Sequence, residues 1–298
     1  MSSGVMTSGR AAKRRHADFG LVRRKRDNAA CGLCGTAGAL TKTHIPPQAA
    51  GNGGLVGRSR LGSQDGELIR SRSLHGGLYV YGLCAACNVL GSKYDAAYAE
   101  LSDAVRSLWV RSWALSVPDR LAVPASEVAP GSVARSMLTG AFGLSPSLRT
   151  QFPGLAASLL AEEARILLPD ALRLRLALCR GEAAHIAGAT GGIFLFGKRV
   201  AGRAIGVSSV ACVFFPPLAW HLAGAGSAAT LLDEQGWADV SGWAMRDATD
   251  RQPLNELVEK LPAVAYPRQH PEQAEAYTEL LSDKFTEIVE CVQMPPSK

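Results

Sequence analysis

Two pairs of cysteines with metal-ligand spacing carry the strongest chemical signal in the sequence. The tight turn within each Cys-x-x-Cys pair points both sulfurs to one side, so that one tetrahedral Zn²⁺ can take both. Two such pairs supply four ligands and leave no open position, which predicts a structural site whose binding energy contributes to folding. The alternative is two unrelated pairs of buried cysteines. The predicted ligands are Cys31, Cys34, Cys84 and Cys87.

Three further side chains in or beside this cysteine frame could act on a substrate. His44 lies between the two pairs, in the segment Thr-His-Ile-Pro-Pro, and Asn88 directly follows the second pair. Asp95 comes seven residues after Asn88, which is about two helical turns, so the two side chains can share one face of a helix. Structural roles stay open here: His44 could pack beside the zinc or donate to a backbone carbonyl, Asn88 could cap a helix, and Asp95 could be a solvated helix residue.

The order of these residues resembles the HNH endonuclease superfamily, in its four-cysteine zinc branch that includes the recombination endonuclease VII type. The resemblance covers about residues 30–105. It consists of Cys-x-x-Cys, His-hydrophobic-Pro from His44 to Pro46, a second Cys-x-x-Cys followed by Asn88, and Gly-x-x-x-Asp from Gly91 to Asp95. It implies a treble-clef-like ββα-metal module that contains the structural zinc.

The chemistry implied by this resemblance is metal-assisted hydrolysis of phosphodiester bonds. His44 matches the general base, and an imidazole that titrates near neutral pH suits this role. Asn88 matches the helix-start asparagine that binds the catalytic cation or orients the histidine. Asp95 is then a candidate second ligand for that cation, Mg²⁺ or Mn²⁺.

Thr43 is a departure from the family pattern, which usually has Asp, Glu or His before the base as a cation ligand. A neutral hydroxyl is a poorer ligand for a hard cation. Three outcomes follow. Asp95 and Asn88 hold the ion without help, an acid of the following loop (Asp65 or Glu67) joins them, or the module binds nucleic acid without cutting it.

Basic side chains are concentrated in two segments. Residues 1–30 hold eight of the 32 basic and two of the 26 acidic side chains, so this arm carries the whole formal charge of +6. Such an arm attracts polyanions, although it could equally be a solvated tail. The Gly-, Ser- and Arg-rich segment 49–76 predicts a long loop with a short hairpin near Gln64, whose arginines would contact phosphates or simply face solvent. The predicted nucleic-acid contacts are Arg14, Arg15, Arg23, Arg24, Arg26, Arg58, Arg60, Arg70 and Arg72.

The elements that must position the site are two strands and a helix. We expect a strand that ends at Pro46, a second strand at Leu78–Tyr81, and one helix from Asn88 to about Trp113, whose apolar residues recur at helical spacing. Beyond a proline-rich segment at 116–132, which predicts a linker, the pattern indicates more mixed structure. It consists of helices in 133–180, strands in 183–222 and a helix at 271–292.

The predicted fold class is therefore α+β, with a zinc-stabilised, HNH-like ββα-metal module followed by a mixed α/β C-terminal domain. That domain carries no chemistry that its residues identify, and it could support a homo-oligomer. The predicted organisation is a flexible arm (1–30), the zinc module (31–115), a linker (116–132) and the C-terminal domain (133–298).

Composition excludes a disordered chain, because 47% of the residues are hydrophobic and only 19% are charged. The start of the sequence has no apolar core typical of a signal peptide. The longest apolar region, 205–224, is interrupted by Pro216-Pro217, so we expect no membrane span. A cytoplasmic, reducing setting is the expectation, and there paired cysteines favour metal over disulfides.

The predicted function is that of a metal-dependent endonuclease acting on nucleic acid, in the first place DNA, with a structural Zn²⁺ and a catalytic Mg²⁺ or Mn²⁺. Bacterial nucleases of such a layout often act against foreign DNA, which is an analogy at the level of the fold. Two alternatives belong to other classes: an inactive zinc module that binds nucleic acid, and a regulatory or interaction protein that zinc scaffolds.

Overall fold

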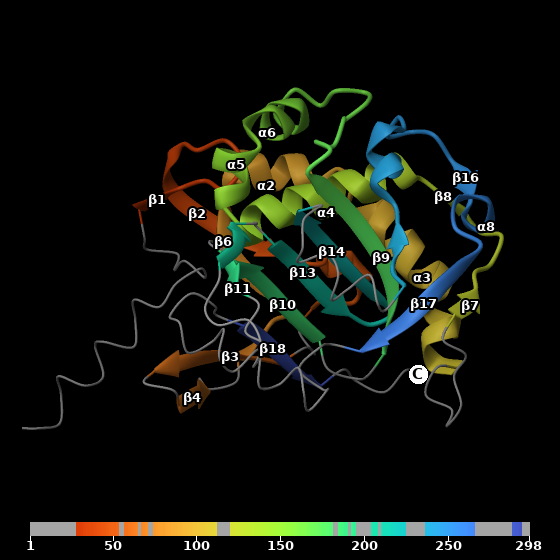
Figure 1. Cartoon of the computed structure of the whole chain (residues 1–298), viewed down its shortest axis with the longest axis horizontal. Helices are drawn as coiled ribbons and strands as arrows, with labels where there is room; N and C mark the ends of the chain where they lie inside the picture. The colour runs from red at the N-terminus through yellow and green to blue at the C-terminus, as the bar shows by residue number, and fades with distance from the viewer. Residues whose placement is uncertain are drawn as a thin grey trace, which may run out of the picture.

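A computed structural model gives the architecture of a mixed α+β protein with several sheets (Figure 1). The structure describes residues 28–53, 57–64, 67–70, 74–111, 120–180, 184–189, 192–194, 204–207, 210–224, 236–265 and 288–293. The basic arm (1–30) therefore lies outside the described residues, apart from its last three.

A small antiparallel sheet carries the cysteine pairs. Its strands are β1 (Asn28–Ala30), β2 (Ala37–His44) and β6 (Tyr79–Cys84), in the order β1-β2-β6. The first cysteine pair lies in the turn between β1 and β2, where Gly35 takes a φ of +78° that favours glycine. The second pair spans the end of β6 and the start of α2 (Ala85–Ser92). The two strands expected around His44 and at 78–81 are confirmed.

The helix expected from Asn88 to Trp113 is two helices in the structure. The first, α2, begins at Ala85, and the second, α3, spans Asp95–Arg111. Between them, the amides of Lys93 and Tyr94 donate to carbonyls three residues back, which tightens the last turn of α2 and ends it. The expected apolar face of the second helix is confirmed, because its buried apolar residues recur at helical spacing. They are Tyr98, Leu101, Val105 and Trp109.

An eleven-stranded sheet forms the larger part of the structure, with its main path in the order β4-β3-β18-β10-β13-β14-β9-β17-β7. All its pairs are antiparallel except β17 with β9. The hairpin predicted near Gln64 is confirmed, with Gln64 opposite Glu67, and so are the strands in 183–222. The strands are β3 (Gly57–Gln64), β4 (Glu67–Arg70), β5 (Leu74–His75), β7 (Arg120–Ala122), β9 (Leu172–Arg180), β10 (Ala184–Ala189), β13 (Val210–Phe215), β14 (Leu218–Gly224), β15 (Ala238–Asp239), β17 (Lys260–Ala265) and β18 (Ile288–Gln293).

Three of the expectations from sequence are wrong. The segment 49–76 is not one long loop, because it contains η1 (Gln48–Ala50) and the strands β3, β4 and β5. The helices predicted in 133–180 end with α6 (Pro153–Leu160), and Leu172–Arg180 is strand β9 instead. The end of the helix expected at 271–292 is strand β18, which pairs with β3 and β10.

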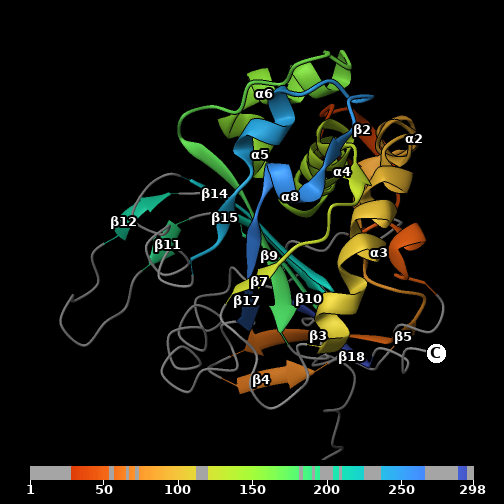
Figure 2. The same ribbon diagram turned by 90° about the vertical axis from the view of Figure 1, so that its right-hand side faces the viewer.

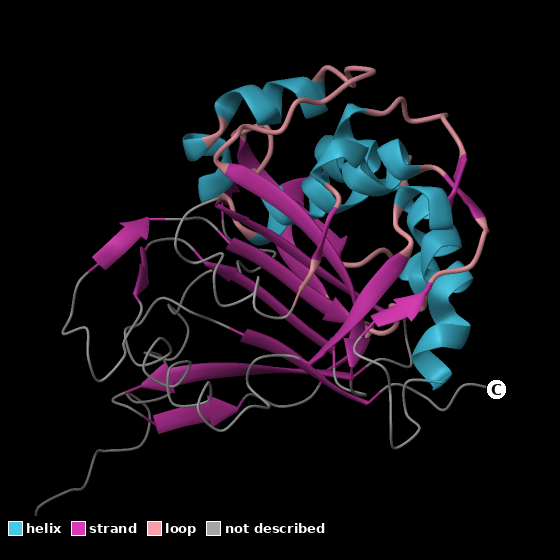
Figure 3. Cartoon of the chain, turned by 45° about the vertical axis from the view of Figure 1, so that its right-hand side comes forward, coloured by secondary structure: helices cyan, strands magenta, loops and turns pink. Residues whose placement is uncertain are grey.

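Helix α4 (Pro130–Leu144) is buried along its whole length and connects the two sheets. It contacts α2, α3, β2 and β6 on one side and β10, β13 and β14 on the other (Figure 2). Figure 3 shows the helices gathered on one side of the large sheet. One hydrophobic core contains residues from Cys31 to Leu261, so the segments before and after 116–132 share a core.

The remaining elements are short and lie around α4 and the ends of the large sheet. Within the described ranges, no helix has the length and apolar character needed to cross a membrane. These elements are β8 (Glu127–Val128), α5 (Ser147–Gln151), α6 (Pro153–Leu160), β11 (Gly192–Phe194), β12 (Ala204–Val207), η3 (Ser241–Met245), β16 (Gln252–Pro253) and α8 (Leu254–Leu257).

Candidate functional site

The four predicted zinc ligands lie together. The sulfur atoms of Cys31, Cys34, Cys84 and Cys87 are all within 4.8 Å of one another. The sulfurs of Cys34 and Cys84 are 3.8 Å apart. Four sulfurs at the tetrahedral corners around a zinc ion, each about 2.3 Å from it, would be separated by about 3.8 Å. The cluster therefore has the dimensions and donor set of a structural zinc site.

The pKa values of the thiols of Cys34, Cys84 and Cys87 are shifted by burial and by the neighbouring cysteines. Burial raises the pKa of the Cys87 thiol, with a further contribution from the nearby Cys31, and burial also raises the pKa of Cys84. Burial acts in the same direction at Cys34, but hydrogen bonds with Thr36, Cys31 and Cys87 together outweigh it and lower the pKa to about 6. Four thiolates this close repel one another without a cation, which is the charge that Zn²⁺ supplies.

His44 is the last residue of β2, and the strand pairing places it opposite Tyr79 of β6. The two ring centroids are 5.4 Å apart. The Nε2 atom of His44 lies 3.0 Å from the main-chain oxygen of Gly76. A carbonyl oxygen only accepts, so Nε2 carries the hydrogen, and in the neutral ring Nδ1 holds the lone pair. Nδ1 is therefore the atom that could take a proton from water.

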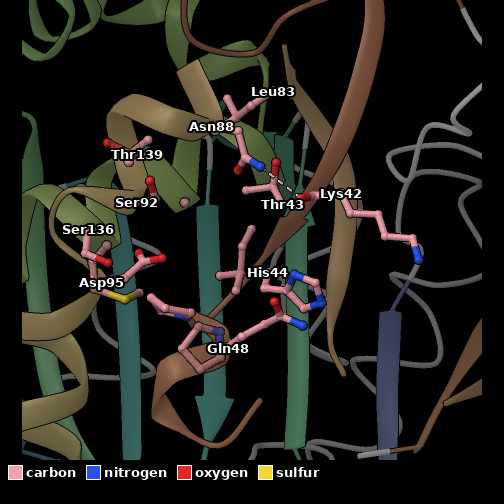
Figure 4. Close-up of a pocket in the computed structure, with 16 residues that line it drawn as sticks. Lys42, Thr43, His44, Gln48, Leu83, Asn88, Ser92, Asp95, Ser136 and Thr139 are labelled. Carbon is pink, nitrogen blue, oxygen red and sulfur yellow. Dashed lines mark hydrogen bonds between the residues drawn. The ribbon is translucent and has the colours of Figure 1, made fainter. Parts of the chain in front are cut away.

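Asn88 lies in the first half of α2 and is not its N-cap, because the N-cap position is Cys84. The side-chain amide of Asn88 donates a 3.0 Å hydrogen bond to the main-chain oxygen of Lys42 (Figure 4). Its Oδ1 atom makes no hydrogen bond within the described residues. Asn88 thus connects α2 to the strand that carries His44 and keeps one oxygen available.

A cavity of about 290 Å³ joins the three predicted polar residues. It lies between the end of β2, the helix α2, the first residue of α3 and the buried helix α4 (Figure 4). His44, Asn88 and Asp95 all contribute to its wall. The structure therefore brings the candidate base and both candidate cation ligands around one space.

The direction of each side chain follows from the alternation along β2. Lys42 and His44 share the face that carries Tyr79, and the ammonium of Lys42 lies 4.7 Å above that ring. Thr43 points to the opposite face, where it is buried against the end of α4. In Figure 4 the Asp95 carboxylate lies near Ser136 and the His44 ring lies on the other side of the view. His44 and Asp95 therefore both line the cavity but do not contact each other.

Asp95 is half-buried and makes no hydrogen bond or ion pair within the part of the chain that the structure describes. Burial raises the pKa of its carboxyl to about 6. A nearby cation would favour the charged form and oppose this shift. A half-buried carboxyl with a raised pKa that lines a cavity is a candidate functional residue.

Sequence reasoning missed the contribution of α4 to this cavity. Ser136, Met137, Thr139 and Gly140 form one wall of it. These residues share one helical face, with spacings of three and four, but the helix lies beyond the segment that resembles the HNH superfamily. Nothing local in the sequence connects that face to His44.

The predicted nucleic-acid contacts fall in different places. Arg58 and Arg60 lie on β3 and Arg70 on β4, at the edge of the large sheet and away from α2 in Figures 1 and 2. Glu67 opens β4. The remaining predicted contacts, and Asp65, lie outside the described residues: Arg14, Arg15, Arg23, Arg24, Arg26 and Arg72.

The chain matches no family model, and it has no significant match to a curated protein sequence or to a solved structure.

Proposed function

We propose that the protein is a metal-dependent endonuclease that hydrolyses phosphodiester bonds of DNA, with β2, β6 and α2 as an HNH-like unit. The observation that carries the proposal is the shared cavity of His44, Asn88 and Asp95 beside the four-cysteine cluster. The order of these elements, a cysteine pair, a strand, a second strand, and a second cysteine pair where the helix begins, is the one that the resemblance implies.

In this proposal His44 is the general base. Nδ1 takes a proton from the attacking water, while the Gly76 oxygen holds Nε2–H and fixes the tautomer. Asn88 is a positioning residue, because its amide holds the main chain of Lys42 two residues before the base. The four cysteines would fix the relative placement of α2 and β2, since the first pair precedes β2 and the second spans the end of β6 and the start of α2.

Asp95, together with Oδ1 of Asn88, would hold the catalytic Mg²⁺ or Mn²⁺. When bound, such a cation stabilises charge on the scissile phosphate and on the leaving oxygen. Asp95 suits this role because its carboxylate faces the cavity and has no basic partner within the described residues. The two residues come from adjacent helices, α2 and α3, that meet at the break after Ser92.

Cleavage of supercoiled plasmid in Mg²⁺ or Mn²⁺ tests this function. The zinc-loaded protein should nick and linearise the plasmid, and His44→Ala should lose at least about 100-fold in rate, as removal of a general base does. Gln48→Ala is the matched control, because Gln48 lines the same cavity but is exposed and has no part in the chemistry. Equal rates for the wild type and His44→Ala would contradict the proposal.

A second candidate is a zinc module that binds nucleic acid without cutting it, and Thr43 is the observation that favours it. The buried hydroxyl of Thr43 stands where the family usually has a cation ligand. Binding without cleavage, in the wild type and in His44→Ala alike, would support this candidate. Absence of DNA affinity even at low salt would instead favour a regulatory or interaction protein scaffolded by zinc.

A further inference from the structure

The sheet that carries the cysteine pairs has one face with an uncompensated positive charge. Lys42 and His44 lie two residues apart on β2, and the strand pairing sets them opposite Tyr81 and Tyr79 of β6, so these four side chains share a face. Strands β1, β2 and β6 contain no acidic side chain, and neither does α2. The charge of Lys42 therefore has no counterpart in its own sheet or in the helix that follows it.

Lys42 is exposed and forms no ion pair within the described residues. Its Nζ atom lies 4.7 Å from the centroid of the Tyr79 ring. Such a cation–π contact orients an ammonium group without neutralising its charge. The other two lysines that the structure describes, Lys93 and Lys260, each pair with a glutamate. Lys42 thus presents its positive charge to solvent in a defined place.

The ammonium of Lys42 lies near the candidate base. With the Tyr79 centroid 4.7 Å from Nζ and 5.4 Å from the imidazole centroid of His44, Nζ and the imidazole are at most about 10 Å apart. Both residues line the cavity, and in Figure 4 their side chains lie on the same side of the view, away from Asp95. A group bound at Lys42 would therefore lie beside the group on which His44 acts.

Two contacts hold Lys42 at the two ends of the residue. The side-chain amide of Asn88 binds its main-chain oxygen at 3.0 Å, and the Tyr79 ring lies against its ammonium. A lysine side chain that is free to rotate loses entropy when it binds a ligand, and restraint in advance reduces this cost. Lys42 is therefore better prepared to bind an anion than a lysine without such contacts.

The spacing along β2 matches a nucleic-acid strand. A lysine ammonium binds phosphate as a compact point charge with three donors. Two residues of a strand rise by about 6.6 Å, and neighbouring phosphates of one nucleic-acid strand are a similar distance apart. A strand with one phosphate at His44 could therefore place the next phosphate at Lys42.

We propose that Lys42 binds the phosphate next to the scissile one on the strand that is cut, with Tyr79 holding its ammonium in place. This inference rests on the proposed function and makes Lys42 a residue that binds the substrate outside the reacting group. It also narrows the substrate class to polynucleotides with a phosphate beyond the bond that is cut. A single phosphodiester would not reach Lys42.

The salt dependence of DNA binding tests this contact without any cleavage. Fluorescence anisotropy of a labelled DNA duplex with the zinc-loaded full chain, in buffer without Mg²⁺ or Mn²⁺, gives Kd at a series of salt concentrations. Lys42→Met keeps an unbranched side chain but removes the charge. It should weaken binding about three- to tenfold at about 0.1 M salt and reduce the slope of log Kd against log salt by about 0.9, as expected for loss of one phosphate contact.

Matched variants make the result specific. Lys42→Arg keeps the charge and should retain the slope. Lys260→Met removes an exposed lysine of the large sheet that pairs with Glu259, so it should bind DNA like the wild type. Equal zinc content and equal thermal unfolding separate loss of the contact from loss of the fold. An unchanged slope in Lys42→Met would overturn the proposal, as would an equal decrease in Lys260→Met.

A small substrate separates Lys42 from the reacting group. Bis(p-nitrophenyl) phosphate contains one phosphodiester and no neighbouring phosphate. In Mg²⁺ or Mn²⁺, Lys42→Met should raise KM for DNA with little change in kcat, and it should leave the rate on the small diester within about twofold of the wild type. A fall by the same factor on both substrates would overturn the proposal, because Lys42 would then act on the scissile phosphate itself.

The outcome is distinguishable from failure of the nuclease. DNA binding whose salt slope depends on Lys42, in a protein that cuts no DNA, would support the phosphate contact and reject the nuclease. Cleavage of DNA together with a slope that Lys42→Met leaves unchanged would reject the contact and keep the nuclease. Absence of DNA binding even at low salt would reject both.

Discussion

The side-chain amide of Asn88 holds the main-chain oxygen of Lys42 at 3.0 Å, two residues before His44. This contact joins the helix that contains Cys87 to the strand that follows the first cysteine pair. Because Asn88 is adjacent to Cys87, the cysteine cluster and the hydrogen bond hold α2 against β2 at neighbouring points. The position of the candidate base thus depends on the side-chain amide of a residue on α2.

Replacing Asn88 should therefore impair the rate more than substrate affinity. Asn88→Ala removes the amide donor, so we expect kcat to fall about 10- to 100-fold with KM changed less than threefold, and stability to fall by about 1 kcal/mol. Steady-state cleavage and urea unfolding measure the two effects. Ser92→Ala, which removes another hydrogen bond of α2 that stays within the helix, is the control. A change in KM alone would contradict a positioning role.

The cysteine cluster should hold one zinc ion per chain. Cys87→Ser should lose zinc and destabilise the fold by at least about 3 kcal/mol, because metal binding contributes directly to folding. Cys179→Ala removes a buried thiol that lies in a different cluster of the core, so this variant should keep its zinc. Metal analysis by mass spectrometry and thermal unfolding with and without a chelator make the comparison. Full zinc content in Cys87→Ser would show that the ion, if present, is bound elsewhere.

His221 should make the protein sensitive to acid. Its ring is fully buried on β14, with Arg175 opposite on β9 and Cys212 opposite on β13, and burial followed by the nearby Arg175 charge lowers its pKa to about 3. An unfolded histidine titrates near 6.5. The unfolded state therefore binds more protons between these values, so stability should fall as the pH drops from about 6.5 towards 3 and stay flat above 6.5.

Denaturant unfolding between pH 4 and pH 8 measures this dependence. We expect the wild type to lose up to about 1.4 kcal/mol per pH unit from this residue below pH 6, and His221→Gln to lose correspondingly less. His221→Gln keeps a polar side chain of similar size. Parallel pH profiles for the two proteins would show that His221 is protonated as readily in the folded state as in the unfolded state.

The contact of α4 with β6 depends on the absence of a side chain at Gly82. A Cβ there would lie 1.9 Å from the main-chain oxygen of Gly143, which neither backbone can avoid without moving. Gly82→Ala should therefore cost more than about 3 kcal/mol of stability and weaken zinc retention. Gly154→Ala, on α6 with open space around the added methyl group, should be neutral or stabilising by up to about 1 kcal/mol. Equal stabilities of the two variants, from urea unfolding, would contradict the close packing.

The parts of this structure that the sequence predicts are those set by local patterns. The four cysteines are brought together by a tight turn at the first pair, the strand-to-helix junction at the second, and the pairing of β2 with β6. Pro46 and Pro47 end β2 because proline cannot continue a strand. The hairpin at Gln64 and the β13–β14 turn likewise follow from turn residues between apolar or alternating segments.

The parts that the sequence did not predict depend on contacts between distant segments. Leucine and arginine alternate at the start of β9, from Leu172 to Leu176, which is a strand period, but the helical pattern on its N-terminal side masked it. Strand β3 pairs with β18 near the C-terminus, and no local pattern indicates that partner. Thr139 lines the cavity because glycines on two other elements let α4 approach closely. The sequence alone therefore could not locate the wall of the cavity that α4 forms.

Chemical rescue of a base-deleted variant tests the central claim most directly. His44→Gly should cut plasmid DNA at less than about 1% of the wild-type rate in single-turnover conditions with Mg²⁺. Millimolar imidazole should restore at least a tenfold higher rate, because a free imidazole can occupy the space of the missing ring and take the proton from water. Zinc content equal to the wild type confirms that the variant is folded. A wild-type protein that does not cut DNA, or a His44→Gly variant that cuts at the wild-type rate without imidazole, would contradict the account.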